Sequence, residues 1–106
     1  MTTLCSLNGR IAAIAETAIS PLDRGLLFGD GVYETMRIAS GQTLRRADHL
    51  ARLRRSLASV SIPEPEGIET AIIELLNATN LHTGSLFLQV TRGVGPRAHL
   101  PSPTMS

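Results

Sequence analysis

The stretch Asp23–Arg37 reads DRGLLFGDGVYETMR, and the rest of the chain is organised around it. It opens with a predicted turn at residues 23–25 and passes through a short apolar segment to a glycine hinge at residues 29–31. Two glycines around an aspartate give the backbone access to positive φ, where an ordinary residue would be strained. Beyond the hinge, side chains alternate with a period of two, which predicts a β-strand over Val32–Ala39.

The two faces of this predicted strand carry different side chains. One face holds a phenol, a hydroxyl and a guanidinium from Tyr33, Thr35 and Arg37. Such a face is either solvated or one wall of a binding site, and the alternation fits both interpretations. Glu34 points the opposite way, so we do not expect it to be catalytic.

Hairpins and helices account for the remaining chain. Asn8-Gly9 is a strong signal for a tight hairpin, and Ser40-Gly41 predicts a second turn. The strands expected besides Val32–Ala39 are Thr2–Leu7, Arg10–Ala13, Gln42–Leu44 and Leu86–Thr91, and the expected helices are Ala47–Val60 and Glu66–Thr79.

Apolar residues recur at helical spacing in both predicted helices. The first stripe comprises Leu50, Leu53, Leu57 and Val60, and the second comprises Ile68, Ile72, Leu75 and Leu76. Prolines 63 and 65 are expected to end the first helix and to begin the second. Because hairpins join neighbouring strands and the helices are consecutive, we predict an α+β fold, an antiparallel sheet covered on one face by two helices.

Composition narrows the class of protein. With 106 residues the chain is long enough for one domain with one core. Its net charge of +1 gives little attraction to nucleic acid or to an anionic membrane. No apolar run approaches about 18 residues, and the N-terminus has no signal-peptide pattern, so we expect a cytoplasmic protein. No histidine–cysteine group has the spacing of a metal site.

Clustered arginines raise a nucleic-acid alternative. Five arginines lie within residues 45–55, as in a helix that contacts the phosphate backbone of a nucleic acid. One tyrosine and two phenylalanines in the whole chain leave little surface for stacking on bases. The composition therefore disfavours nucleic acid as a partner.

The strings DRG and FGDGVYE, in this order, resemble the N-terminal domain of the D-amino-acid transaminase-like class of pyridoxal-phosphate enzymes, the class IV aminotransferases. This class also includes branched-chain aminotransferases and aminodeoxychorismate lyase. The resemblance implies the fold of that domain, pyridoxal 5′-phosphate as cofactor, amino acids and 2-oxo acids as substrates, and a homodimer.

Arg52 lies in the string HLARL, residues 49–53. By pattern alone it is a surface arginine paired with Asp48. The resemblance implies instead that Arg52 holds the cofactor phosphate, a role that suits a guanidinium because it grips phosphate through two hydrogen bonds. His49 is expected to be structural, near the edge of the apolar stripe.

The resemblance also implies substrate contacts. Tyr33 and Thr35 would line the substrate side of the cofactor pocket. The strings QVTRG, residues 89–93, and PRAH, residues 96–99, resemble the carboxylate trap of D-alanine-type transaminases. Arg97 and His99 would then hold the substrate carboxylate in the active site of the partner subunit. Branched-chain aminotransferases and the lyases do not usually show this Arg-x-His string.

All ten basic residues are arginines, and the chain contains no lysine. Transamination by pyridoxal phosphate needs a lysine amine that joins the cofactor covalently and carries a proton. We therefore expect no catalytic residue in this chain, which would be inactive alone, and the resemblance places the lysine in a C-terminal domain. The expectation is that residues 1–106 form the N-terminal part of a longer two-domain enzyme. An aminodeoxychorismate lyase-type enzyme and a stand-alone, non-catalytic interaction domain of the same fold are the alternatives.

Overall fold

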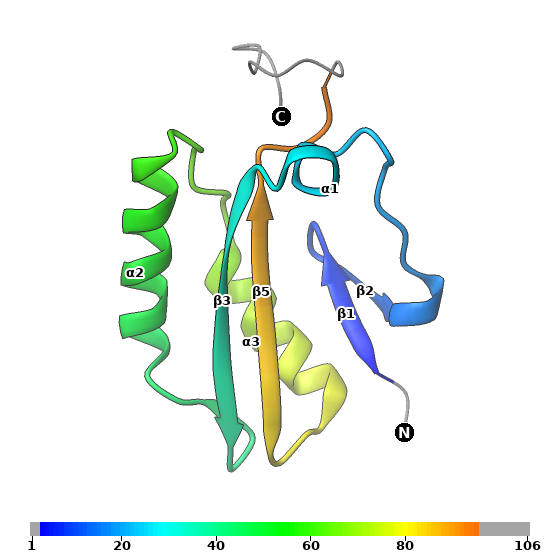
Figure 1. Ribbon diagram of the computed structural model, residues 1–106. Helices are drawn as coiled ribbons and strands as arrows, with labels where there is room; N and C mark the ends of the chain where they lie inside the picture. Colours follow the sequence, from blue (N-terminus) through cyan, green and yellow to red (C-terminus); the bar gives the residue numbers. More distant parts are fainter. Residues whose placement is uncertain (1–2, 96–106) are drawn as a thin grey trace.

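The computed structural model describes residues 3–95 and has the predicted α+β architecture. Its central sheet is antiparallel in the order β4-β3-β5, and a separate hairpin is formed by β1 and β2 (Figure 1). The elements are β1 (Leu4–Leu7), β2 (Arg10–Ala13), the 3-10 helix η1 (Ile14–Glu16), α1 (Arg24–Phe28), β3 (Gly31–Ala39), β4 (Gln42–Thr43), α2 (Arg46–Ser59), α3 (Ile68–Thr79) and β5 (Gly84–Thr91).

β3 is the central strand of the sheet. It pairs with β5 along eight positions, from Gly31 opposite Thr91 to Ile38 opposite Gly84. The short strand β4 pairs only with Ile38 and Ala39. The rest of this edge of β3 is left without a strand partner among residues 3–95, and α2 lies beside it (Figure 1).

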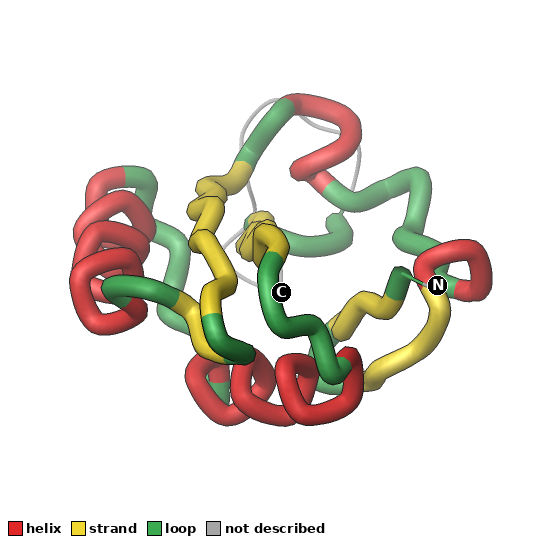
Figure 2. The backbone as a smooth tube through the Cα atoms, turned by 90° about the horizontal axis from the view of Figure 1, so that it is seen from below, coloured by secondary structure: helices red, strands yellow, loops and turns green. Residues whose placement is uncertain are grey.

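Two helices cover one face of the sheet. In Figure 1 α3 passes behind β3 and β5 while α2 lies beside β3, and Figure 2 shows both helices grouped around the same side. The sheet contributes Met36, Ile38, Leu86 and Val90 to the buried core. Tyr33 and Phe87, on the other face, are 65% and 62% exposed. The predicted division of the β3 side chains between two faces is confirmed.

The N-terminal hairpin forms as predicted. Asn8 and Gly9 both adopt positive φ, 54° and 86°, as a tight two-residue turn requires. β1 packs near α3 (Figure 2), so the hairpin extends the layer that covers the sheet. None of the helices within residues 3–95 is long and apolar enough to cross a bilayer.

The end of α2 differs from the prediction. Val60, expected in the apolar stripe, is 39% exposed, whereas Ile62 is buried. The chain leaves the helix through Ser61 at φ 57°, with the Ser61 amide donating to Ala58 and the Ile62 amide donating to Leu57. This Schellman turn reverses the backbone and places Ile62 in the core in place of Val60.

Two further boundaries differ from the prediction. α3 begins at Ile68 after Gly67 at φ 75°, so Pro63 and Pro65 lie in the connection and not in its first turn. The segment after Asp23, expected as a turn leading into an apolar segment, forms the short helix α1. Local caps explain this helix, because the Asp23 side chain accepts the Gly25 amide at 2.8 Å and Gly29 ends the helix at φ 63°.

Candidate functional site

A buried carboxylate on β3 binds two side chains of α2. Glu34 is 6% exposed and accepts hydrogen bonds from Arg52, from Nε to Oε2 at 2.9 Å and from Nη2 to Oε1 at 2.8 Å, with a longer one from Nε to Oε1 at 3.2 Å. The Nδ1 atom of His49 lies 2.8 Å from the same Oε1. We refer to Glu34, His49 and Arg52 as the Glu34 cluster. Its bidentate geometry fixes the plane of the guanidinium.

Electrostatic interactions keep Glu34 and Arg52 ionised. The hydrogen bonds from Arg52 lower the pKa of Glu34 against the opposing effect of burial, and His49 lowers it further. The same hydrogen bonds raise the pKa of Arg52. Glu34 is therefore a carboxylate and Arg52 a cation at neutral pH.

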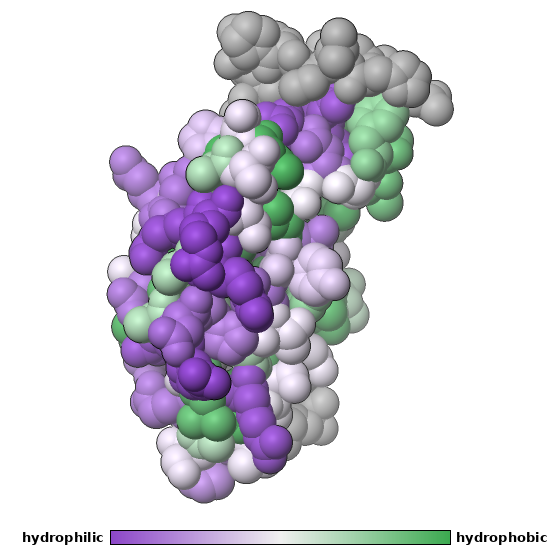
Figure 3. All heavy atoms as spheres, turned by 60° about the vertical axis from the view of Figure 1, so that its left-hand side comes forward, coloured by the Kyte–Doolittle hydropathy of each residue, from purple (hydrophilic) through white to green (hydrophobic). Residues whose placement is uncertain are grey.

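Arg52 also presents a free edge to solvent. Its side chain is 60% exposed, and its Nη1 atom has no hydrogen-bond partner within residues 3–95. It lines a shallow cavity of about 260 Å³ together with Arg45, Asp48, His49 and Arg55. Figure 3 shows hydrophilic side chains gathered over this side of the molecule. The cavity has the charge and the free donors to bind an anion such as a phosphate.

The structure shows partners in this region that the sequence did not reveal. Arg52 does not pair with Asp48, which instead contacts Arg45 at 3.3 Å, because Arg52 reaches across to the sheet. His49, expected to be structural, is a polar partner of Glu34. For Glu34 the sequence predicted the face of the strand but no partner. Its signal was available, because a carboxylate on a buried face requires cationic or hydrogen-bonding partners.

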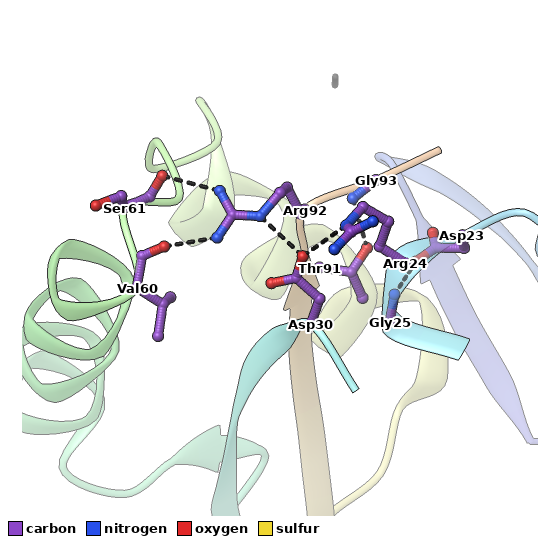
Figure 4. Close-up of polar contacts among 9 residues, drawn as sticks. All are labelled: Asp23, Arg24, Gly25, Asp30, Val60, Ser61, Thr91, Arg92 and Gly93. Carbon is purple, nitrogen blue, oxygen red and sulfur yellow. Dashed lines mark hydrogen bonds and ion pairs between the residues drawn. The ribbon is translucent and has the colours of Figure 1, made fainter. Parts of the chain in front are cut away.

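A second carboxylate lies where β3 begins (Figure 4). Oδ2 of Asp30 accepts a hydrogen bond from Nε of Arg24 and another from Nε of Arg92, both at 2.8 Å. Burial opposes ionisation of Asp30, but the two arginines outweigh it and lower its pKa. We refer to Arg24, Asp30 and Arg92 as the Asp30 cluster. Their side chains are 3%, 16% and 17% exposed, so this ion pair is largely shielded from water.

Backbone contacts around the Asp30 cluster join strings that are distant in the sequence. The Arg92 amide donates to the Asp30 carbonyl at 3.0 Å, and the Arg24 amide donates to the Gly93 carbonyl at 2.8 Å. A Cβ on Gly25 would lie 2.2 Å from Cγ2 of Thr91. The strings DRG, GDG and TRG therefore meet at one point, and at Gly25 the close approach leaves no space for a side chain.

The open face of the sheet holds the predicted substrate residues. Tyr33 stacks on Phe87 with ring centroids 5.5 Å apart, and Thr35 lies opposite Phe87 in the register. Tyr33 and Thr35 thus share one surface, as predicted. Arg52 contacts the other face of β3 through Glu34, and within residues 3–95 no hydrogen bond joins it to Tyr33 or Thr35.

This open face continues into a groove at the far end of β3. Arg37 and Thr35 line the groove, which has a volume of about 420 Å³, together with Thr83 and Ser85. Arg97 and His99, the predicted carboxylate trap, lie outside the described residues.

A family model for class IV amino-transferases matches residues 31–106. This chain belongs to the class IV aminotransferase family. The D-alanine aminotransferase of Bacillus licheniformis is 42% identical to this class IV chain over 96 residues, which are 87% of the chain and 34% of that protein.

Solved structures agree on the class IV fold. A 4-amino-4-deoxychorismate lyase from Pseudomonas aeruginosa has a TM-score of 0.72 at 35% identity, over 92% of this chain and 34% of its own. The branched-chain aminotransferase of Escherichia coli has a TM-score of 0.83 at 19% identity, over 93% of this chain and 35% of its own, and shows the fold alone. The class IV chain spans about a third of the length of the curated relatives it matches.

Proposed function

We propose that this chain is the N-terminal domain of a pyridoxal-phosphate-dependent aminotransferase acting on D-amino acids, in which Arg52 binds the cofactor phosphate. The observation that carries this proposal is the division of the Arg52 guanidinium into a fixed and a free edge. Glu34 holds Nε and Nη2, while Nη1 faces the cavity without a partner among residues 3–95. A preoriented cation loses little freedom when it binds a phosphate.

The bound cofactor supplies an electron sink for the substrate's α-carbon. The chain's own residues bind and orient. Arg52 would bind the phosphate and offset part of its charge, the Glu34 carboxylate would keep the guanidinium in place, and Tyr33 and Thr35 would form a wall of the substrate pocket. The chain holds no lysine, so the amine that reacts with the cofactor belongs, in this proposal, to a domain outside the 106 residues.

We propose D-alanine and 2-oxoglutarate as the substrate type, with Arg97 and His99 holding the α-carboxylate. The 42% identity to a D-alanine aminotransferase supports this assignment. A homodimer follows from the same proposal, because the pair would serve the partner's active site. We also propose a cytoplasmic location for the protein.

A lyase is the second candidate, favoured by the 35% identity to a 4-amino-4-deoxychorismate lyase. Turnover of the full-length protein with D-alanine and 2-oxoglutarate, compared with 4-amino-4-deoxychorismate, decides between the two. For a transaminase, Arg97→Ala raises KM for both D-alanine and 2-oxoglutarate by roughly tenfold or more, because a hydrogen bond to a charged group is lost. Unchanged KM values for both substrates contradict the carboxylate trap.

The phosphate role is tested with Arg52→Ala in the full-length protein that contains this chain. We expect the variant to lose affinity for pyridoxal phosphate by roughly tenfold or more, since hydrogen bonds to a charged group are lost. Binding of pyridoxal, which lacks the phosphate, stays close to that of the wild type. Arg55→Ala is the matched control, because Arg55 lines the same cavity without contacting Glu34. Equal retention of pyridoxal phosphate by both variants contradicts the proposal.

A further inference from the structure

One arginine at the end of β5 holds the end of α2 (Figure 4). Besides the bond from Nε to Asp30, Nη1 of Arg92 donates to the Ser61 carbonyl at 3.1 Å, and Nη2 donates to the Val60 carbonyl at 2.6 Å. All three nitrogens of this guanidinium therefore have partners. Two of these partners belong to the segment that directly follows α2.

This segment has a hydrogen-bond partner outside the helix. The Schellman turn satisfies the Leu57 and Ala58 carbonyls but requires Ser61 to adopt φ 57°, a conformation that costs a residue with a Cβ. The carbonyls of Val60 and Ser61 point away from the helix, and Arg92 binds both. The end of α2 has Ser61, and not a glycine, at its left-handed position. Arg92 holds this helix end through the two carbonyls.

Elsewhere α2 is attached to the sheet mainly by apolar packing. Its leucines provide contact that is strong but not directional. Arg45, at the N-cap, makes no capping bond through its side chain. Among residues 3–95, hydrogen bonds connect α2 and its C-terminal turn to the β3–β5 sheet at two places, the Glu34 cluster and Arg92.

We propose that Arg92 is a positioning residue for Arg52, which rests on the proposed role of Arg52 in phosphate binding. Arg52 precedes Val60 by eight residues, about 12 Å along the helix axis. A rotation or slide of α2 on its leucine stripe carries the Arg52 guanidinium with it. Asp30, which also accepts a hydrogen bond from Arg24, binds Nε of Arg92. The two remaining nitrogens of Arg92 then bind the end of α2.

The geometry needs an arginine. A planar guanidinium can reach Asp30 and both carbonyls at once, whereas the single ammonium of a lysine cannot span all three. Arg92→Gln removes the charge and these contacts. Arg92→Lys keeps a cation beside Asp30 and loses the bridge to the two carbonyls.

The test measures, in the full-length protein, the affinity for pyridoxal phosphate relative to that for pyridoxal. The ratio isolates the phosphate contribution. We expect Arg92→Gln and Arg92→Lys to lower it by roughly three- to tenfold, because Arg92 affects the phosphate only through the position of Arg52. Arg52→Ala lowers it further, and adding Arg92→Gln to Arg52→Ala changes it no more, because Arg92 acts through Arg52. Arg54 lies on the same helix as Arg52 and forms an exposed pair with Glu64 in the connection after that helix, so Arg54→Gln leaves the ratio unchanged.

The outcomes separate this inference from the proposed function. If Arg52→Ala leaves the ratio unchanged, the phosphate role itself is wrong. If Arg52→Ala lowers the ratio while Arg92→Gln weakens both ligands equally, Arg92 only stabilises the fold and the inference is overturned. Should Arg92→Gln fail to fold, Arg92→Lys decides, and a wild-type ratio in that variant overturns the inference.

Discussion

The Asp30 cluster and the Glu34 cluster both pair a carboxylate with arginine, but they differ in exposure to solvent. Each has a carboxylate at β3, four positions apart, whose pKa is lowered by arginine. In the Asp30 cluster both arginines are largely buried, and Arg92 has a partner for each nitrogen. In the Glu34 cluster Arg52 is 60% exposed and keeps Nη1 free among the described residues.

In our proposal, exposure and unused donors distinguish the phosphate-binding Arg52 from the structural Arg92, since both arginines pair with a carboxylate. A shielded guanidinium whose three nitrogens all have partners inside the protein has little to offer a ligand. One whose inner edge is fixed and whose outer edge is free can bind an anion without rearrangement. Unfolding free energies of variants in the two clusters test this distinction.

The largest effect is expected from Asp30→Ala. The substitution leaves Arg24 and Arg92 with uncompensated charge in a shielded site, and breaking a buried pair costs about 3–5 kcal/mol. Urea unfolding measures the loss. Glu64→Ala, which breaks the exposed pair with Arg54, is the control and costs less than about 1 kcal/mol. A loss for Asp30→Ala no larger than the control means that the Asp30 cluster is not a structural ion pair.

A smaller effect is expected from Glu34→Gln at neutral pH, about 1.5–3 kcal/mol for hydrogen bonds to a charged group. The cost is below that of Asp30→Ala because the released Arg52 can be hydrated in place. Since folding lowers the pKa of Glu34 below its ordinary 4.5, its contribution is present above that value and is lost as the pH falls through the lower, folded-state pKa.

Unfolding free energies of the wild type and Glu34→Gln, measured from neutral pH down to acid, check this dependence. The gap between the two proteins should be largest near neutrality and should narrow below about pH 4.5. Glu64→Gln, at an exposed position, provides the reference curve. A gap that is constant with pH refutes the charged role of Glu34.

The smallest effect concerns the helix end that the Asp30 cluster reaches through Arg92. Ser61→Gly removes the Cβ from a residue at φ 57° and should stabilise the protein by about 1 kcal/mol in urea unfolding. Ala58→Gly, inside the last turn of α2, should destabilise it by about 0.5–1 kcal/mol. Opposite signs for the two glycines show that the left-handed end of α2, and not chain flexibility, determines the effect.

The sequence predicted what local periodicity encodes. The alternation in β3 placed Tyr33 and Thr35 on one face and Glu34 on the other, because strand geometry assigns faces two residues at a time. The helical spacing of the leucines in α2 likewise predicted its buried face. The exact end of α2 was not predicted, because its left-handed position is occupied by Ser61 and not by a glycine. Pro63 indicates that the helix stops nearby, but not that Ile62 replaces Val60 in the core.

Contacts between distant residues were the other gap. Asp30 and Arg92 are separated by 62 positions, and no local pattern connects them. The partner of Arg52, Glu34, could have been predicted from the sequence. Glu34 was assigned correctly to the covered face, and a carboxylate there calls for a cation from the adjacent helix. The phosphate-binding role proposed for Arg52, in the HLARL string, rests on the family resemblance. The structure adds the orientation of the Arg52 guanidinium.

The exposed stack of Tyr33 on Phe87 has a practical consequence for spectroscopy. Tyr33 is the single tyrosine of the chain, and there is no tryptophan. Nearly all intrinsic fluorescence of these 106 residues therefore originates from one phenol on the open face of the sheet. Any molecule that covers this face changes the surroundings of that phenol directly. The chain thus carries its own optical reporter for ligand or domain docking, with no label attached.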